Sequence, residues 1–273
     1  MPGLEVRAMS SLTRQNWFSA CQFHEMNGEQ VLREVALRVE QVRARAAGRR
    51  EAHPLVLLDL DSTLYEVGPR TYQILREWAD SPESRRYPEV RAAAMRAEPW
   101  HVGYSVRDTL SAVGVSPDSP EFPRAFEEIK KFWSERFFSS RYLAYDRPYP
   151  GAVAFVRGLY DLGAEIAYLT GRDEPGMGEG TRSVLLRDGF PWAVERTHLL
   201  MKEAAHLPDL DHKKEAAHYI RRHGTLIASF ENEPPNLVAL RDLFPDAMHV
   251  FVDTVCSDHP APAADGLYLI RGF

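Results

Sequence analysis

The stretch Asp59-Leu60-Asp61-Ser62-Thr63-Leu64-Tyr65 decides how this chain of 273 residues is interpreted. It follows Pro54-Leu55-Val56-Leu57-Leu58, an unbroken apolar run typical of a parallel strand buried on both faces. Because residues i and i+2 of a strand point to the same side, we expect Asp59 and Asp61 to face one crevice if the backbone stays extended. Paired carboxylates suit a divalent cation, or a nucleophile beside a general acid/base. A polar strand end that turns into a loop is the alternative that the pair alone leaves open.

Composition limits the class of protein. Hydrophobic residues make up 44% of the chain and charged residues 26%, as in a soluble globular protein with one α/β domain, or a core domain with an insertion. The net charge of −6 argues against a nucleic-acid or membrane-surface partner. No apolar stretch approaches the roughly 20 residues of a membrane span, and the N-terminus lacks a signal-peptide core. Cys21 and Cys256 imply neither a disulfide framework nor a zinc site, so we expect a cytoplasmic protein.

The pattern along the chain predicts three parts. Residues 1–65 should hold an N-terminal helix, with Asn27 as its N-cap and a stripe of valines, and then the first core strand. Residues 66–148 show helical periodicity and no strand signal. A stretch of about eighty residues is too long and too apolar for a loop, so we expect a helical insertion. Residues 149–273 return to alternating strands and helices.

The third part determines the expected fold class. The pattern predicts helices at 152–162, 181–188, 213–223 and 236–244, and strands at 165–169, 226–230, 249–252 and 266–270. This alternation predicts an α/β protein with a doubly wound, mainly parallel, Rossmann-like sheet. The glycine-rich run at 176–181 lacks the lysine and the preceding strand of a phosphate loop, so we interpret it as a flexible connection leading to Thr181 as a helix N-cap.

Polar residues follow two other predicted strands, at the sheet edge where such folds bind ligands. Thr170-Gly171-Arg172 offers a hydroxyl and backbone N–H groups to a phosphate, although Thr-Gly is also an ordinary turn. Glu231-Asn232-Glu233 is an acidic strand end suited to a hard cation. Lys213 and Lys214 open a helix, where a lysine opposes the helix dipole, so each is either a surface charge or an anion ligand.

Over about residues 54–240, this set of motifs resembles the haloacid dehalogenase-like hydrolase superfamily, whose members are mostly magnesium-dependent phosphatases. The family's Asp-x-Asp-x-Thr-Leu motif matches Asp59 to Leu64, and its strand ending in Thr or Ser matches Thr170. Its helix-opening lysine matches Lys213 better than Lys214, because apolar residues follow Lys213 at +3, +4 and +7. The fourth motif departs from the family. It has Glu-Asn-Glu at 231–233 where Asp is usual, which leaves open which of these residues binds the ion.

The resemblance implies hydrolysis of a phosphate monoester of a small metabolite, with the insertion at 66–148 as a cap over the site. Asp59 would attack phosphorus and form an aspartyl-phosphate, and Asp61 would protonate the leaving alcohol and then activate water. The implied Mg²⁺ ligands are Asp59, the backbone carbonyl of Asp61, Glu231 and Asn232, and the implied phosphate-binding residues are Thr170, Gly171, Arg172 and Lys213. Aromatic residues of the insertion, including Trp100, Tyr104, Phe132 and Trp133, are expected to form the core of the cap rather than contact substrate.

Two alternatives remain at this point. A phosphotransferase or mutase would use the same residues but pass the phosphoryl group to a sugar. A non-catalytic binding protein could keep the fold after its altered fourth motif had lost productive metal binding. The sequence carries no motif for the identity of the substrate or for the oligomeric state.

Overall fold

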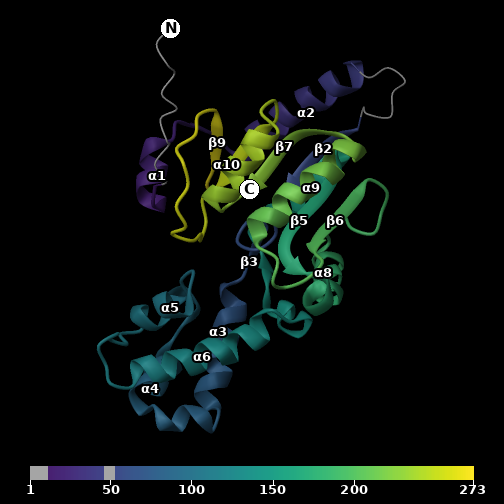
Figure 1. Cartoon of the computed structure of the whole chain (residues 1–273). Coiled ribbons are helices and arrows are strands. Elements are labelled where there is room, and N and C mark those ends of the chain that lie inside the picture. The colour runs from purple at the N-terminus through teal and green to yellow at the C-terminus, as the bar shows by residue number, and fades with distance from the viewer. Residues whose placement is uncertain (1–11, 46–52) are drawn as a thin grey trace.

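A seven-stranded parallel sheet forms the body of the molecule in the computed structural model, which describes residues 12–45 and 53–273 (Figure 1). In spatial order its strands are β1 (Phe23–Glu25), β9 (Leu267–Ile270), β8 (Met248–Val252), β7 (Thr225–Glu231), β2 (Pro54–Leu58), β5 (Glu165–Asp173) and β6 (Thr197–Lys202). Each neighbouring pair runs parallel. The expected α/β fold with a doubly wound, mainly parallel sheet is confirmed.

The alternating side chains of the central strand separate two hydrophobic layers. Val56 and Leu58 of β2 belong to a cluster that includes valines of α2 (Gly28–Arg45). Leu55 and Leu57 point to the opposite face and pack with residues of α9 (Asp209–His223). The remaining helices of the core are α1 (Arg14–Ala20), α7 (Ala152–Asp161), α8 (Glu174–Asp188) and α10 (Pro234–Leu243). Because β2 is covered on both faces, only its carboxyl end can present polar groups to a ligand.

The first expected helix has the capping contacts that the sequence predicts. The backbone N–H of Gln30 donates to the Asn27 side chain at 2.9 Å, and the Gln30 side chain accepts from the Asn27 N–H at 2.8 Å. This reciprocal pair satisfies two N–H groups at the start of α2.

The helical insertion, residues 66–148, lies below the sheet in Figure 1 and is joined to it near β3. Its elements are α3 (Gly68–Asp80), η1 (Glu83–Arg86), α4 (Pro88–Arg96), η2 (Pro99–His101), α5 (Val106–Ala112), α6 (Phe122–Phe137) and η3 (Ser140–Tyr145). The strand residues within it belong to the short antiparallel pair of β3 (Tyr65–Glu66) and β4 (Arg147–Pro148), where the chain leaves the core and returns. The insertion has its own hydrophobic cluster, which includes Trp78, Leu110 and Ile129.

The prediction for the glycine-rich run at 176–181 is wrong. These residues lie inside α8, which begins at Glu174, and the N-cap is Asp173, whose carboxylate accepts the Gly176 N–H at 2.8 Å. Close packing explains Gly180: a β-carbon there would lie 2.5 Å from the carbonyl oxygen of Ser140. The missing side chain therefore lets η3 approach the backbone of α8.

Other element boundaries also differ from the prediction. β5 continues to Asp173 rather than ending at Leu169. The sequence did not indicate this, because the polar residues Thr170, Arg172 and Asp173 are buried by contacts with distant parts of the chain. α9 begins at Asp209, so Lys213 lies one turn inside the helix. The short elements α1 and β1 and the half-buried edge strand β6 were not predicted.

Two further observations concern the described residues. None of the helices in those ranges combines the length and the apolar character needed to cross a membrane. Cys21 and Cys256 are both buried and unpaired, as their low number suggested.

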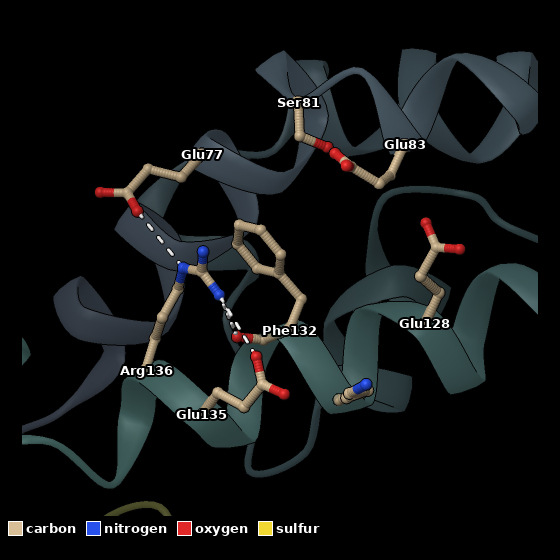
Figure 2. A pocket seen from close by; sticks show the side chains of 8 residues that line it. Glu77, Ser81, Glu83, Glu128, Phe132, Glu135 and Arg136 are labelled. Atoms are coloured by element: carbon tan, nitrogen blue, oxygen red, sulfur yellow. Dashed lines mark hydrogen bonds and ion pairs between the residues drawn. The ribbon is translucent and has the colours of Figure 1, made fainter.

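A polar groove of about 620 Å³ lies on the insertion, between α3, η1 and α6 (Figure 2). Within it, Arg136 lies beside Glu77 and Glu135, with its guanidinium over the Phe132 ring. None of the residues that the sequence nominates for catalysis lines this groove.

His249, the second residue of β8, is a buried titratable group at the amino end of that strand. Its Nε2 lies 2.8 Å from the carbonyl oxygen of Phe244, which can only accept, so Nε2 carries the hydrogen. Nδ1 then accepts from the Ser229 hydroxyl at 2.8 Å. Burial lowers the pKa of His249 to about 4 from its ordinary value of 6.5.

The free energy of unfolding should therefore decrease as the pH falls, because protonation of His249 favours the unfolded chain. The unfolded chain binds a proton there below about pH 6.5, whereas the folded chain stays neutral to about pH 4. Between these values stability should fall by up to about 3 kcal/mol. Urea unfolding of the parent and of His249→Gln at pH 7 and pH 4.5 checks this. The parent should lose more stability than the variant, and equal losses would contradict the assignment.

Candidate active site

A sharp turn follows β2 and separates the two aspartates. The N–H of Tyr65 donates to the carbonyl oxygen of Leu60 at 2.9 Å, and the N–H of Ser62 donates to that of Tyr65 at 2.8 Å. Ser62 has a φ of 62°, in the left-handed region that residues other than glycine rarely adopt. The turn holds Asp59 and Asp61 at the carboxyl end of the central strand, but each meets a different set of partners.

Asp59 shares a buried lysine with Glu231. The Lys213 Nζ donates to the Asp59 Oδ1 at 2.8 Å and to the Glu231 Oε2, and all three residues are less than 10% exposed. Burial and the charge of Glu231 raise the pKa of Asp59 to about 7, against the opposing effect of Lys213. Burial disfavours a charged Lys213, but the two carboxylates outweigh it and raise the lysine pKa. Lys214, the other candidate, is exposed.

The three residues of the fourth motif make different contacts. Glu231 faces Lys213, and its second oxygen accepts the backbone N–H groups of Asn232 and Glu233. Glu233 turns away and accepts from the N–H and the hydroxyl of Ser257, at 2.9 and 2.5 Å. The Asn232 Oδ1 accepts from the Thr63 hydroxyl at 2.9 Å. Of these three residues, Glu231 is therefore the one that reaches Asp59 through a shared partner.

Asp61 lies among arginines. Its Oδ2 accepts from the Arg172 Nε at 2.8 Å, and its Oδ1 accepts from the Nη2 atoms of Arg172 and Arg70, each at 2.8 Å. Burial favours the neutral acid, but the two guanidinium groups outweigh burial and hold the pKa of Asp61 well below its usual range. The Asp61 side chain is still 30% exposed.

The Thr-Gly-Arg segment lies within β5 rather than beyond it. Thr170 is fully buried, and its hydroxyl accepts the N–H of Arg172 at 3.3 Å. A β-carbon on Gly171 would lie 2.5 Å from the Asp209 carboxylate, so a larger residue there would have to displace the Asp209 side chain. The guanidinium of Arg172 forms ion pairs with the carboxylates of Asp61 and Asp146.

One aromatic residue of the insertion reaches the core. The Tyr104 hydroxyl lies near Ser257 and Glu233, and burial and the Glu233 charge raise its pKa to about 12. Tyr104 and Trp100 are 50% and 77% exposed, so the expectation that they form the core of the insertion is wrong. Phe132 and Trp133 do pack against the insertion's hydrophobic cluster, as expected.

The structure thus joins Asp59, Lys213 and Glu231 in one group and Asp61 and Arg172 in another. Sequence reasoning missed Thr63, Arg70, Asp146, Ser257 and Tyr104, which complete these groups. Thr63 stands inside the quoted heptapeptide, where it could have been noticed. The others are single polar residues outside any motif.

The residues around Asp59 fit a divalent cation. Two buried carboxylates share one ammonium group, which leaves one uncompensated negative charge at the end of β2. Mg²⁺ is usually held by one or two carboxylates, with water and substrate oxygens completing its octahedron. Within the described ranges, no group of three or more His, Cys, Asp or Glu side chains is arranged to hold a metal. A magnesium ion here would therefore rely on Asp59 and Glu231 together with oxygens that are not side-chain carboxylates.

No family model matches the sequence, and no curated protein is similar to it. Solved structures with a similar fold include a putative phosphatase from Clostridium difficile, with 10% sequence identity and a TM-score of 0.47 over 81% of this chain and 95% of that chain. A HAD-superfamily hydrolase from Geobacter sulfurreducens has 14% identity and a TM-score of 0.43, over 81% and 92% of the two chains. Protein Tyrosine Kinase A from Mycobacterium tuberculosis has 17% identity and a TM-score of 0.47, over 80% and 94%. These similarities concern the fold alone.

Replacing Lys213 by Met should destabilise the fold by about 3 kcal/mol or more at neutral pH, because two buried carboxylates lose their shared cation. The loss should shrink as the pH falls toward 5, since the carboxylates, whose pKa values are raised, can then take up a proton. Lys214→Met, at an exposed neighbouring position, should change stability by less than about 0.5 kcal/mol. Urea unfolding at pH 5 and pH 8 measures all three chains. Equal stability of the two variants would contradict the role of Lys213.

Proposed function

We propose that this chain is a magnesium-dependent phosphatase that hydrolyses a phosphate monoester through an aspartyl-phosphate intermediate. The observation that carries the proposal is the group at the end of the central strand, where buried Asp59 meets Lys213 and Glu231. The strand-end motifs that resemble the haloacid dehalogenase-like superfamily support the same conclusion, and so do the described similarities of fold.

Asp59 is the proposed nucleophile. It sits at the carboxyl end of β2, and its N–H donates to the carbonyl oxygen of Phe230 at 3.1 Å, which fixes the backbone next to β7. The ammonium group of Lys213 holds the Oδ1 atom of Asp59 and can also attract the oxygens of an incoming phosphate. Attack by Asp59 on phosphorus would form the acyl phosphate and release the alcohol.

Magnesium would be held by Asp59, Glu231 and the backbone carbonyl of Asp61, with the Asn232 side chain at or just beyond the coordination sphere. When bound, it would reduce the repulsion between the attacking carboxylate and the phosphate. Thr170, Gly171, Arg172 and Lys213 are the proposed phosphate contacts. Of these, Arg172 is also committed to Asp61, so its contribution to phosphate binding would be indirect.

Asp61 is the proposed general acid/base. A second aspartate two residues after the nucleophile suits an ester, because an alcohol leaves with a proton whereas a halide does not. The two arginines that contact Asp61 lower its pKa and favour the carboxylate, which is the form that the second step requires. It could then deprotonate the water that cleaves the acyl phosphate.

The insertion at 66–148 is the proposed cap, and a small phosphorylated metabolite in the cytoplasm is the proposed substrate. Arg70, near one end of the insertion, contacts Asp61 and also Asp146, near the other end. The Tyr104 hydroxyl of the insertion lies near Ser257 of the core. A lid in this position would exclude water from the acyl phosphate and restrict the size of the alcohol.

Asp59→Asn tests the nucleophile. The change is nearly isosteric, so the fold should remain, while magnesium-dependent hydrolysis of p-nitrophenyl phosphate should fall by at least about a thousandfold. The exposed Asp118→Asn serves as the matched control and should keep full activity. Equal yields of phosphate and nitrophenol would identify a hydrolase, whereas a phosphate deficit in the presence of sugar would identify a phosphotransferase. Full activity of Asp59→Asn would show that Asp59 is not the nucleophile and would rule out the proposed mechanism.

Glu231→Gln and Glu233→Gln test which acid of the fourth motif binds magnesium. Glu231 shares Lys213 with Asp59, whereas Glu233 is turned to Ser257. We expect Glu231→Gln to raise the Mg²⁺ concentration for half-maximal binding, measured by calorimetry, on the order of tenfold, and Glu233→Gln to change it much less. The reverse order of effects would assign the metal to Glu233.

A further inference from the structure

One neutral side chain, that of Asn232, joins the loops that follow three neighbouring strands. β8, β7 and β2 lie next to one another in the sheet, and the proposed site is at the carboxyl ends of β2 and β7. The turn at 60–65 follows β2, Asn232 follows β7, and the loop at 253–257 follows β8. Asn232 is 2% exposed and contacts both of the other segments.

The two ends of the Asn232 amide have different partners. Its Nδ2 donates to the backbone carbonyl oxygen of Val255 at 2.7 Å, and its Oδ1 accepts from the Thr63 hydroxyl at 2.9 Å. A carbonyl oxygen can only accept, so the atom that faces Val255 is the nitrogen. An ionised aspartate at position 232 could accept from Thr63 but could not donate to Val255. These contacts therefore favour a neutral amide at a position where the fourth motif usually has an acid.

A second contact closes a ring around these segments. Thr254, the residue before Val255, donates its hydroxyl to the carbonyl oxygen of Ser62, the residue before Thr63. The turn and the loop are therefore joined twice, once directly through Thr254 and once through Asn232. Ser62, Thr63 and Asn232 are each less than 10% exposed. Loss of one partner would leave a buried polar group unsatisfied, which is costly.

The ring includes the strained residue of the turn. Ser62 has a φ of 62°, a conformation that residues other than glycine rarely adopt. Such a backbone persists only where the surrounding contacts over-determine it. Both contacts of the ring to the turn fall on Ser62 and its neighbour Thr63. Because Asp61 immediately precedes Ser62, the conformation of Ser62 helps to set where Asp61 lies relative to Asp59.

We propose that Asn232 and Thr63 are positioning residues that hold the turn at 60–65 and so fix Asp61 relative to Asp59. This inference rests on the proposed phosphatase function, in which both aspartates act on the substrate. The Asn232 amide serves as a link between two loops and is not itself a magnesium ligand. Thr254 supports the same link from the loop at 253–257.

A link and a metal ligand predict different effects of the same substitutions. Asn232→Asp keeps an oxygen that a magnesium ion could use but removes the donor to Val255, so a ligand would tolerate the change and a link would not. Thr63→Val keeps the size of the side chain and removes only the hydroxyl, which matters to a link alone. Thr63→Ser keeps the hydroxyl. A merely structural contact would alter stability without changing kcat below the unfolding transition.

The experiment compares the parent with Asn232→Asp, Thr63→Val and Thr63→Ser. Asn16→Asp makes the same chemical change at an exposed position and is the matched control. Hydrogen exchange with mass spectrometry, without magnesium or substrate, reports the opening of segments 60–65 and 253–257, where backbone N–H groups are hydrogen-bonded. Kinetics with p-nitrophenyl phosphate and magnesium give kcat and KM. Thermal unfolding shows that each chain is folded, and Thr63→Val adds no charge, so the test stands even if Asn232→Asp does not fold.

In Asn232→Asp and Thr63→Val, exchange in both segments should be about tenfold faster, and kcat should fall about tenfold or more while KM stays within about threefold of the parent value. Thr63→Ser and Asn16→Asp should match the parent. Parent-like exchange and kcat in Thr63→Val, or full activity of Asn232→Asp, would overturn the inference. Faster exchange with unchanged kcat would also overturn it, because the contacts would then be purely structural.

Failure of the proposed function gives a different result. A parent that releases no phosphate from p-nitrophenyl phosphate with magnesium would refute the phosphatase and the catalytic part of this inference. The exchange measurement needs neither magnesium nor turnover, so it would still decide whether Asn232 and Thr63 hold the turn.

Discussion

The site depends on one buried ammonium group, that of Lys213, between the carboxylates of Asp59 and Glu231. Two buried carboxylates without a cation would repel each other and would be driven to take up protons. Burial and the charge of Glu231 raise the pKa of Asp59 to about 7, although the neighbouring Lys213 acts to lower it. The lysine comes from α9, Glu231 from β7 and Asp59 from the end of β2, so this single cation ties three elements together. The remaining negative charge makes the same place suitable for a divalent cation.

A second charge cluster, around Asp61, connects this core to the helical insertion. Arg70 and Asp146 come from the two ends of the insertion, and Arg172 comes from β5. The two aspartates of the first motif therefore have separate electrostatic environments: burial and a neighbouring acid raise the pKa of Asp59, whereas two arginines lower that of Asp61 against the effect of burial. The Tyr104 hydroxyl of the insertion also lies near Ser257 and Glu233 of the core.

The sheet, the helical insertion and the residues Asp59, Asp61, Lys213 and Glu231 could be predicted because each lies beside a local apolar pattern of the right period. Arg70 and Asp146 could not, since they are 76 residues apart and meet only through tertiary packing. The helix at 174–188 was misjudged because its glycines lower helix propensity. The reason for one of them, the close contact of Gly180 with Ser140, lies 40 residues away in the sequence. The polar end of β5 was missed for a similar reason: its arginine is buried by carboxylates from other segments.

The central claim is that Asp59 carries the phosphoryl group during the reaction. Acid quenching during steady-state turnover of p-nitrophenyl phosphate with Mg²⁺, followed by borohydride reduction, would convert an acyl phosphate into homoserine at the modified position. Peptide mass spectrometry should then find homoserine at residue 59 and leave Asp61 unchanged. Phosphate release without any modification of Asp59, or modification of Asp61 in its place, would contradict the account.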